Sequence, residues 1–120
     1  MKKKIYVLED DADIGELIAF LLTEQGYEVS VFSTIASFRQ YANHNPLPAL
    51  LIIDVMLPDG NGLDVCKEWK TAATTQSIPI LVMSAYEDYR HDNRAQDADG
   101  FISKPFDIKS FLVDVKAQLS

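Results

Sequence analysis

The chain has 120 residues, which fits one domain covering residues 1–120. Its 18 acidic and 11 basic residues give a formal net charge of −7, which argues against direct nucleic-acid binding, because phosphate contacts need clustered Lys and Arg. No stretch approaches the roughly 20 apolar residues of a membrane span, and the apolar run after Lys2–Lys4 is too short for a signal peptide. Cys66 is the only cysteine, which fits a reducing compartment, so we expect a cytoplasmic protein with no membrane segment.

Apolar runs and helical periodicity alternate along the whole chain. Short apolar runs are typical of buried strands, whereas apolar residues at intervals of three and four are typical of one helix face. Segments rich in polar residues, Pro and Gly separate them. The expected elements, in chain order, are a strand at 5–8, a helix over 14–21, a strand at 27–32, a helix over 35–42, a strand ending at 54, a helix starting near 62, a strand at 78–84, a short helix within 86–96, a strand at 100–103 and a helix over 108–119.

Polar residues and one glycine mark where several of these helices begin and end. Asp11 or Asp13 can accept hydrogen bonds from the free N–H groups at the start of the first helix, and Asp107 can do so for the last helix. Gly26 can supply the left-handed residue that ends the first helix. Segment 86–96 lacks a clear apolar stripe, so its short helix is expected to be poorly anchored.

The most informative stretch is residues 49–60. Five apolar residues lead directly into Asp54, and a run without alternation is typical of a strand covered on both faces, as in a parallel sheet. Pro58 and the pair Asp59-Gly60 then indicate a turn. Asp54 is therefore expected at the carboxyl end of a central strand, which is the edge where open α/β sheets form their sites.

Strict alternation of strands and helices predicts a parallel sheet with helices on both sides. A dinucleotide-binding fold would need a glycine-rich turn after the first strand, but that turn is Glu9-Asp10-Asp11 and the chain has no G-x-G-x-x-G motif. Three acids there would repel a pyrophosphate. We therefore predict an α/β, flavodoxin-like (βα)5 doubly wound parallel sheet with strand order 2-1-3-4-5.

This strand order brings distant polar residues to one edge of the sheet, namely Asp10, Asp11, Asp54, Ser84 and Lys104. Two carboxylates 4 Å apart repel by about 4 kcal/mol at an effective dielectric constant of 20. A hard cation, Mg²⁺ or alternatively Mn²⁺, would relieve that repulsion. A divalent ion beside a carboxylate, a hydroxyl and an ammonium group is typical of phosphoryl transfer. Asp54 is then the expected nucleophile, forming an aspartyl phosphate, with Lys104 and Ser84 as its catalytic partners.

These motifs resemble the receiver domain of two-component response regulators. They occur in family order and span essentially the whole chain. The matching pieces are Leu8-Glu9-Asp10-Asp11, Ile53-Asp54-Val55-Met56-Leu57-Pro58-Asp59-Gly60, Ser84-Ala85 and Lys104-Pro105-Phe106.

The resemblance implies a phosphorelay role for the site. Asp54 would accept a phosphoryl group from a phosphohistidine on a sensor histidine kinase or a histidine phosphotransfer protein. Asp11 and Asp54 would bind Mg²⁺ directly, Asp10 would act through water, and the main-chain carbonyl of Met56 would complete the protein ligands. Lys104 would contact the phosphoryl group. The expected activity is Mg²⁺-dependent self-phosphorylation followed by slow self-dephosphorylation.

The resemblance also implies a conformational switch. Ser84 and Phe101 fill the hydroxyl and aromatic switch positions, and a cis bond is common before the proline that matches Pro105. The family often has glycine where this chain has Asp97, so Asp97 is expected to take up a left-handed turn. The output face would be the fourth helix, fifth strand and fifth helix, through which a homodimer could form.

Alternative functions remain open at this stage. A receiver-like interaction module that never uses phosphate would normally lack an acid or the lysine, and neither is missing here. A haloacid-dehalogenase-like phosphatase would need a second Asp where the chain has Met56. Met56 and Tyr86 follow Asp54 and Ser84 by two residues each, and their bulk would shield an aspartyl phosphate from water.

Overall fold

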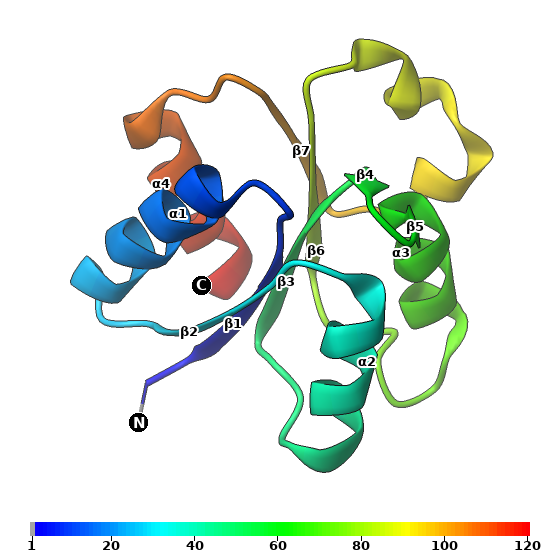
Figure 1. Cartoon of the computed structure of the whole chain (residues 1–120), viewed down its shortest axis with the longest axis horizontal. Coiled ribbons are helices and arrows are strands. Elements are labelled where there is room, and N and C mark those ends of the chain that lie inside the picture. The colour runs from blue at the N-terminus through cyan, green and yellow to red at the C-terminus, as the bar shows by residue number, and fades with distance from the viewer. Residues whose placement is uncertain (1) are drawn as a thin grey trace.

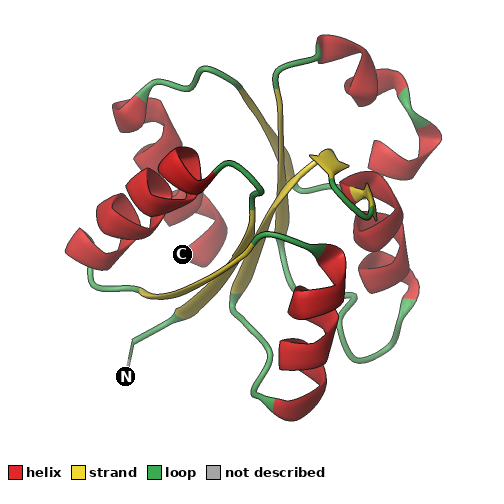
Figure 2. Ribbon diagram, in the orientation of Figure 1, coloured by secondary structure: helices red, strands yellow, loops and turns green. Residues whose placement is uncertain are grey.

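A five-stranded parallel sheet forms the centre of the molecule (Figures 1 and 2). The computed structural model describes residues 2–120, apart from the side chains of Glu87 and Asp88. The sheet order is β2-β1-β3-β6-β7, and every neighbouring pair is parallel. Numbered in chain order, these five strands have the predicted order 2-1-3-4-5, which confirms the flavodoxin-like fold. The strands are β1 (Lys4–Leu8), β2 (Glu28–Phe32), β3 (Leu50–Asp54), β6 (Ile80–Ser84) and β7 (Gly100–Ser103).

Four α-helices cover the two faces of this sheet (Figure 1). Helices α1 (Ala12–Glu24) and α4 (Ile108–Leu119) pack on one face, and α2 (Ile35–His44) and α3 (Gly62–Thr71) on the other. The central strand β3 contributes to both cores: Leu51 and Ile53 face α2 and α3, while Leu50 and Ile52 face α1 and α4. Burial on both sides explains why the sequence of β3 is apolar without alternation.

The helix ends follow the sequence signals. The side chain of Asp11 accepts hydrogen bonds from the N–H groups of Asp13 and Ile14, so Asp11 rather than Asp13 caps α1. Asp107 caps α4 through the N–H of Ser110. Gly26 has φ of 90°, which confirms the left-handed residue expected after α1.

The connection between β6 and β7 differs from the prediction. Instead of one short α-helix within residues 86–96, it forms two 3₁₀ helices, η1 (Glu87–His91) and η2 (Asn93–Ala95). Short 3₁₀ turns suit a segment that has too few apolar residues to form a helix stripe. The expected left-handed turn at Asp97 was also wrong, because no described residue other than glycine has a positive φ.

Polar contacts fasten this connection to α3, and a hydrogen bond from Arg90 to Ser103 fastens it to β7. Arg94 of η2 makes ion pairs with Asp92 at 2.7 Å and with Asp64 of α3 at 2.8 Å. Tyr89 and Ala95 are buried beneath it. The ion pairs of Arg94 and the burial of Tyr89 and Ala95 therefore anchor a segment that the sequence predicted to be poorly anchored.

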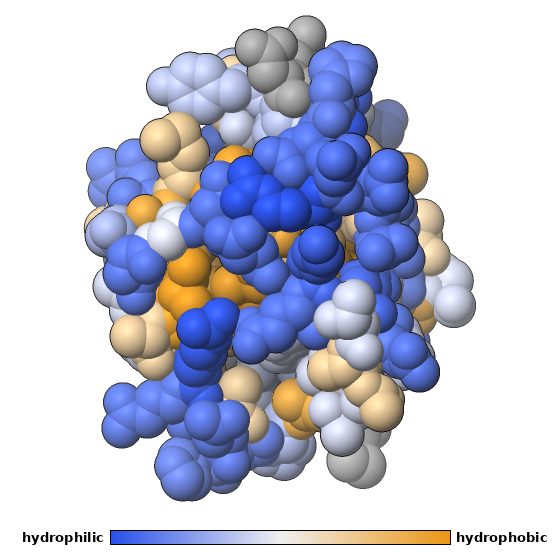
Figure 3. All heavy atoms as spheres, turned by 90° about the vertical axis from the view of Figure 1, so that its right-hand side faces the viewer, coloured by the Kyte–Doolittle hydropathy of each residue, from blue (hydrophilic) through white to orange (hydrophobic). Residues whose placement is uncertain are grey.

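The side of the molecule that carries α2 and α3 is grooved. A groove of about 610 Å³ between these helices has Phe38 and Trp69 among its lining residues. An ion pair of 2.8 Å between Arg39 and Glu68 joins the two helices. Figure 3 faces this side and shows a mainly hydrophilic surface with apolar patches between the polar side chains.

The lengths and apolar content of the helices test whether any of them could span a membrane. Within residues 2–120, no helix combines the length and apolar character needed to cross a bilayer.

Candidate functional site

Asp54 lies at the carboxyl end of β3, where two contacts hold its carboxylate and a third holds the backbone of the next residue. Its side chain is mostly buried, with a residue exposure of 7%. The ammonium nitrogen of Lys104 lies 2.5 Å from Oδ2, and the N–H of Met56 donates to Oδ1 at 3.2 Å. The N–H of Val55 donates to the carbonyl of Met83 on the neighbouring strand. The carboxylate is thus fixed at the sheet edge, as its position after an apolar strand predicted.

Lys104 bridges two acids that come from different strands. Besides Asp54, its ammonium group donates to Oε1 of Glu9, directly after β1. The backbone N–H of Lys104 donates to the carbonyl of Ser84 at 2.9 Å. This bond places the Cα atom of Lys104 beside the end of β6. The peptide bond from Lys104 to Pro105 is cis, as the resemblance implied.

Burial shapes the electrostatics of this group. It raises the pKa of Glu9 to about 7, and the neighbouring Asp54 carboxylate adds to the rise while Lys104 opposes it. Burial acts against the charge of Lys104, but hydrogen bonds to Asp54 and Glu9 outweigh it and raise the lysine pKa. The site therefore holds an excess of negative charge that one ammonium group only partly neutralises.

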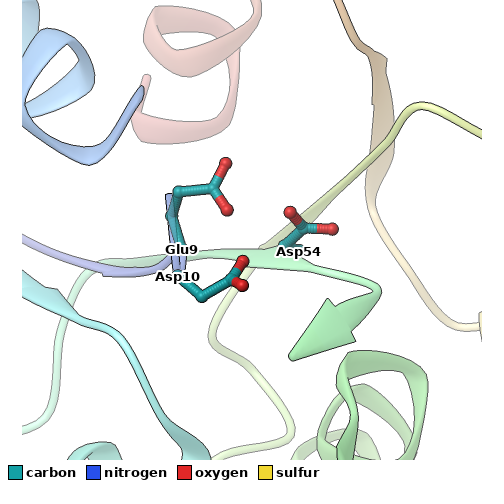
Figure 4. A group of neighbouring side chains, drawn as sticks. All are labelled: Glu9, Asp10 and Asp54. Atoms are coloured by element: carbon teal, nitrogen blue, oxygen red, sulfur yellow. The ribbon is translucent and has the colours of Figure 1, made fainter. Parts of the chain in front are cut away.

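Glu9, Asp10 and Asp54 form a group of acids that could hold a metal ion. Each offers one carboxylate oxygen, and these three oxygens lie within 4.8 Å of one another. Figure 4 shows the three side chains directed toward a common space, two from the end of β1 and one from the end of β3. Oε2 of Glu9 is buried and has no hydrogen-bond partner among the described residues. An all-oxygen set with one unpaired buried oxygen fits a hard divalent cation.

Asp11 lies outside this group of acids, which disagrees with the expected direct contact between Asp11 and a metal ion. Its Oδ1 accepts hydrogen bonds from the N–H groups of Asp13 at 3.0 Å and Ile14 at 3.1 Å. The acids that converge on Asp54 are one residue earlier, Glu9 and Asp10. The sequence held a signal for this shift, because a carboxylate that caps a helix is already occupied by backbone N–H groups.

A hollow of about 320 Å³ opens over these acids. Ser84 lies on its wall at the end of β6, where it is buried and its hydroxyl accepts a hydrogen bond from the N–H of Tyr86 at 3.0 Å. Met56 and Tyr86 also line the hollow and are 60% and 65% exposed. A buried hydroxyl at the wall and two bulky side chains at the rim thus surround the space above Asp54.

Phe101 lies on β7, and its backbone pairs with Val82, two residues before Ser84 on β6. Alternation along a strand puts Phe101 and Ser84 on the same face of the sheet. The Phe101 ring packs 5.6 Å from the ring of Tyr89. The guanidinium of Arg90 lies 5.5 Å above the Phe101 ring and donates to Ser103 at 2.9 Å. Phe101 is therefore partly buried under the β6–β7 connection.

Comparisons with known proteins agree with this fold. The family model described as "Response regulator receiver domain" matches residues 5–116. The phosphate regulon transcriptional regulatory protein PhoB of Klebsiella pneumoniae is 34% identical over 98% of this chain and 52% of its own length. The chain thus spans about half the length of the curated relatives it matches.

Solved structures give the same result. The response regulator protein TrrA from Thermotoga maritima, solved in complex with Mg²⁺-BeF, superimposes with a TM-score of 0.88 at 28% identity, covering 99% of this chain and 100% of that one. The non-phosphorylated HemR receiver domain from Leptospira biflexa gives a TM-score of 0.87 at 30% identity, covering 99% and 95%.

Proposed function

Because the chain belongs to the response regulator receiver domain family, we propose that it accepts a phosphoryl group on Asp54 from a phosphohistidine of a partner protein. The observation that carries this proposal is the convergence of Asp54, Lys104 and two further acids, Glu9 and Asp10, at one sheet edge. The partner would be a sensor histidine kinase or a histidine phosphotransfer protein.

A divalent ion, Mg²⁺ or alternatively Mn²⁺, would be held by Glu9, Asp10, Asp54 and the main-chain carbonyl of Met56. When bound, the ion neutralises phosphoryl oxygens and lowers the charge barrier to attack. In this set Glu9 takes the place of Asp11, because the oxygen of Asp11 is engaged at the start of α1. The unpaired buried oxygen of Glu9 supports the replacement.

Lys104 and the backbone prepare the nucleophile. The ammonium group and the N–H of Met56 hold the two carboxylate oxygens of Asp54 in a fixed orientation. An Asp54 oxygen forms a bond to phosphorus while the phosphorus–nitrogen bond of the donor histidine breaks, and the departing imidazole nitrogen takes up a proton. Lys104 then neutralises one oxygen of the transferred group, which adds negative charge to an already acidic site.

Ser84 and Phe101 would transmit the change. The Ser84 hydroxyl can turn from the N–H of Tyr86 to donate to the new phosphoryl oxygens. Phe101 lies on the same sheet face and would move into the space that Ser84 leaves. This would alter the surface formed by the β6–β7 connection, β7 and α4, which is the expected output face. A homodimer through that face on phosphorylation stays a prediction of the same proposal.

The alternative, an interaction module that does not use phosphate, has no observation in its favour, because the acids, hydroxyl and lysine converge. The two functions are separated by incubation with acetyl phosphate and Mg²⁺, followed by intact-mass measurement. We expect the wild type and Asp114→Asn, which alters an exposed acid on α4, to gain one phosphoryl group, and Asp54→Asn to gain none. Equal labelling of Asp54→Asn, or no labelling of the wild type by either acetyl phosphate or a phosphohistidine protein, would reject the proposal.

A further inference from the structure

A short hairpin lies between the end of β3 and the start of α3 (Figure 1). It consists of β4 (Met56–Leu57) and β5 (Gly60–Asn61), which pair in the antiparallel direction. Its first residue belongs to the proposed site, because the N–H of Met56 donates to Oδ1 of Asp54 and the Met56 carbonyl is a proposed metal ligand. The position of the hairpin therefore determines where that carbonyl lies.

The hairpin is too small to hold this position by itself. Isolated two-stranded hairpins are marginally stable in water, and each strand here has only two residues. Hairpin turns of two residues favour left-handed backbone, which matches the twist of the strands. The turn residues here are Pro58 and Asp59, and neither has a positive φ. The hairpin therefore depends on contacts with the rest of the chain.

Asp59 makes such a contact with helix α2. Its Oδ1 accepts a hydrogen bond from the N–H of Ile35 at 2.9 Å, and its Oδ2 accepts one from the N–H of Ala36 at 2.9 Å. These are the first two N–H groups of α2, which have no partner within the helix. The negative charge also lies at the positive end of the helix dipole. Both carboxylate oxygens thus tie the turn of the hairpin to α2.

The start of α2 is a firm support for the hairpin. Ile35 is buried in the core beneath α2 and α3, and Leu57 of the hairpin packs against the same core. On the basis of the proposed phosphoacceptor function, we propose that Asp59 is a positioning residue of the phosphoryl site. By joining the hairpin to α2, it fixes the N–H and the carbonyl of Met56 beside Asp54.

A helix cap alone would be a simpler role for Asp59. That role already has an occupant in Thr34, which directly precedes α2 and whose Oγ1 accepts a hydrogen bond from the N–H of Ser37 at 3.1 Å. Thr34 acts within its own segment, whereas Asp59 reaches α2 from the loop that follows the phosphoacceptor strand. The two residues therefore offer a matched comparison, because both bond to the start of α2 and only Asp59 belongs to the hairpin.

The proposed coupling acts in both directions. A contact that fixes a ligand before the ion arrives reduces the ordering cost of binding, so its loss should weaken binding. By linkage, Mg²⁺ bound at Met56 should in turn strengthen the contact between Asp59 and α2. The amide signals of Ile35 and Ala36 should therefore shift during a Mg²⁺ titration of the wild type, and these shifts should largely disappear in Asp59→Ala.

Mg²⁺ titrations followed through amide NMR shifts test the proposal on Asp59→Ala and Thr34→Ala. Both variants lose hydrogen bonds at the start of α2, but only Asp59→Ala releases the hairpin. We expect Asp59→Ala to raise the Kd for Mg²⁺ about fivefold or more and Thr34→Ala to change it less than about twofold. In the metal-free protein, NMR relaxation of the backbone amides should show larger motions of residues 56–61 in Asp59→Ala alone.

Asp59→Asn and salt separate position from charge. Asparagine keeps one oxygen that can accept from α2 but carries no charge, so its Kd should lie between those of the wild type and Asp59→Ala. The ratio of the Asp59→Ala and wild-type Kd values should also persist at high salt, which screens exposed charges. Equal Kd values for Asp59→Ala and Thr34→Ala, or a ratio that falls to one at high salt, would overturn the positioning role and leave the proposed function standing. A wild type that binds no Mg²⁺ would instead reject the proposed metal site, and the positioning role with it.

Discussion

Gly62, the first residue of α3, lies directly against the carbonyl oxygen of Asp54. A Cβ atom at position 62 would be 2.0 Å from that oxygen, and the N–H of Gly62 donates to the carbonyl of Val55 at 2.7 Å. The start of α3 therefore fits against the backbone of the proposed phosphoacceptor with no space for a side chain.

Gly62→Ala should consequently disturb both stability and phosphorylation. The close contact is with backbone, which cannot swing aside, so we expect a loss of about 1–3 kcal/mol in the free energy of unfolding and slower labelling by acetyl phosphate. Urea unfolding and intact mass measure the two effects. Gly15→Ala is the control, since its Cβ would lie 3.2 Å from a side-chain atom of Val31 and alanine favours a helix interior. Equal stability of the two variants would contradict the packing argument.

Metal affinity should distinguish the two proposed ligand sets. Glu9→Gln removes a carboxylate from the group formed with Asp10 and Asp54, whereas Asp11→Asn alters the cap of α1. We expect Glu9→Gln to raise the Kd for Mg²⁺ about tenfold or more and Asp11→Asn to change it little. A Mg²⁺ titration followed through amide NMR shifts gives both constants. The reverse order of effects would restore Asp11 as a direct ligand.

Asp59 provides a pH-dependent contribution to stability. Its carboxylate accepts hydrogen bonds at 2.9 Å from the N–H groups of Ile35 and Ala36 at the start of α2, and these bonds lower its pKa. Because the folded pKa is lowered, the stabilisation is present above the unfolded pKa and is lost as the pH falls through the folded value.

The variant Asp59→Asn should thus be less stable than the wild type at neutral pH, and the difference should shrink at acidic pH. Thermal unfolding at a series of pH values measures this. Asp114→Asn, which removes the same charge from an exposed site on α4, should show no such convergence. If the deficit of Asp59→Asn were constant from neutral to strongly acidic pH, the charged hydrogen bonds would not be its source.

The rim of the phosphoryl hollow should set the lifetime of the aspartyl phosphate. Met56 and Tyr86 are bulky and stand at its opening, where they can hinder the approach of an attacking water. Replacement of both by small polar residues, Met56→Asn and Tyr86→Ser, is expected to speed dephosphorylation about tenfold or more. The decay of labelled protein after removal of the phosphodonor measures the rate. An unchanged decay would show that steric shielding does not control it.

The sheet and most of the site could be predicted because each depends on local pattern. The uninterrupted apolar run before Asp54 indicated a doubly covered strand, and strand order then brought Lys104 to the same edge. The role of Asp11 was harder to predict, because three successive acids follow β1 and the capping residue is the immediate neighbour of the acid group; the capping signal at Asp11 could have separated the two roles. A short helix was predicted within segment 86–96, but its anchoring could not be, because Arg94 contacts Asp64, which is distant in sequence.

The position of β3 also has a consequence for the dynamics of the molecule. Both of its edges are paired and both of its faces are buried, so its amide protons should exchange with solvent only when the whole domain opens. The proposed phosphoacceptor Asp54 is thus mounted on a strand whose amide protons are expected to exchange among the slowest in the chain.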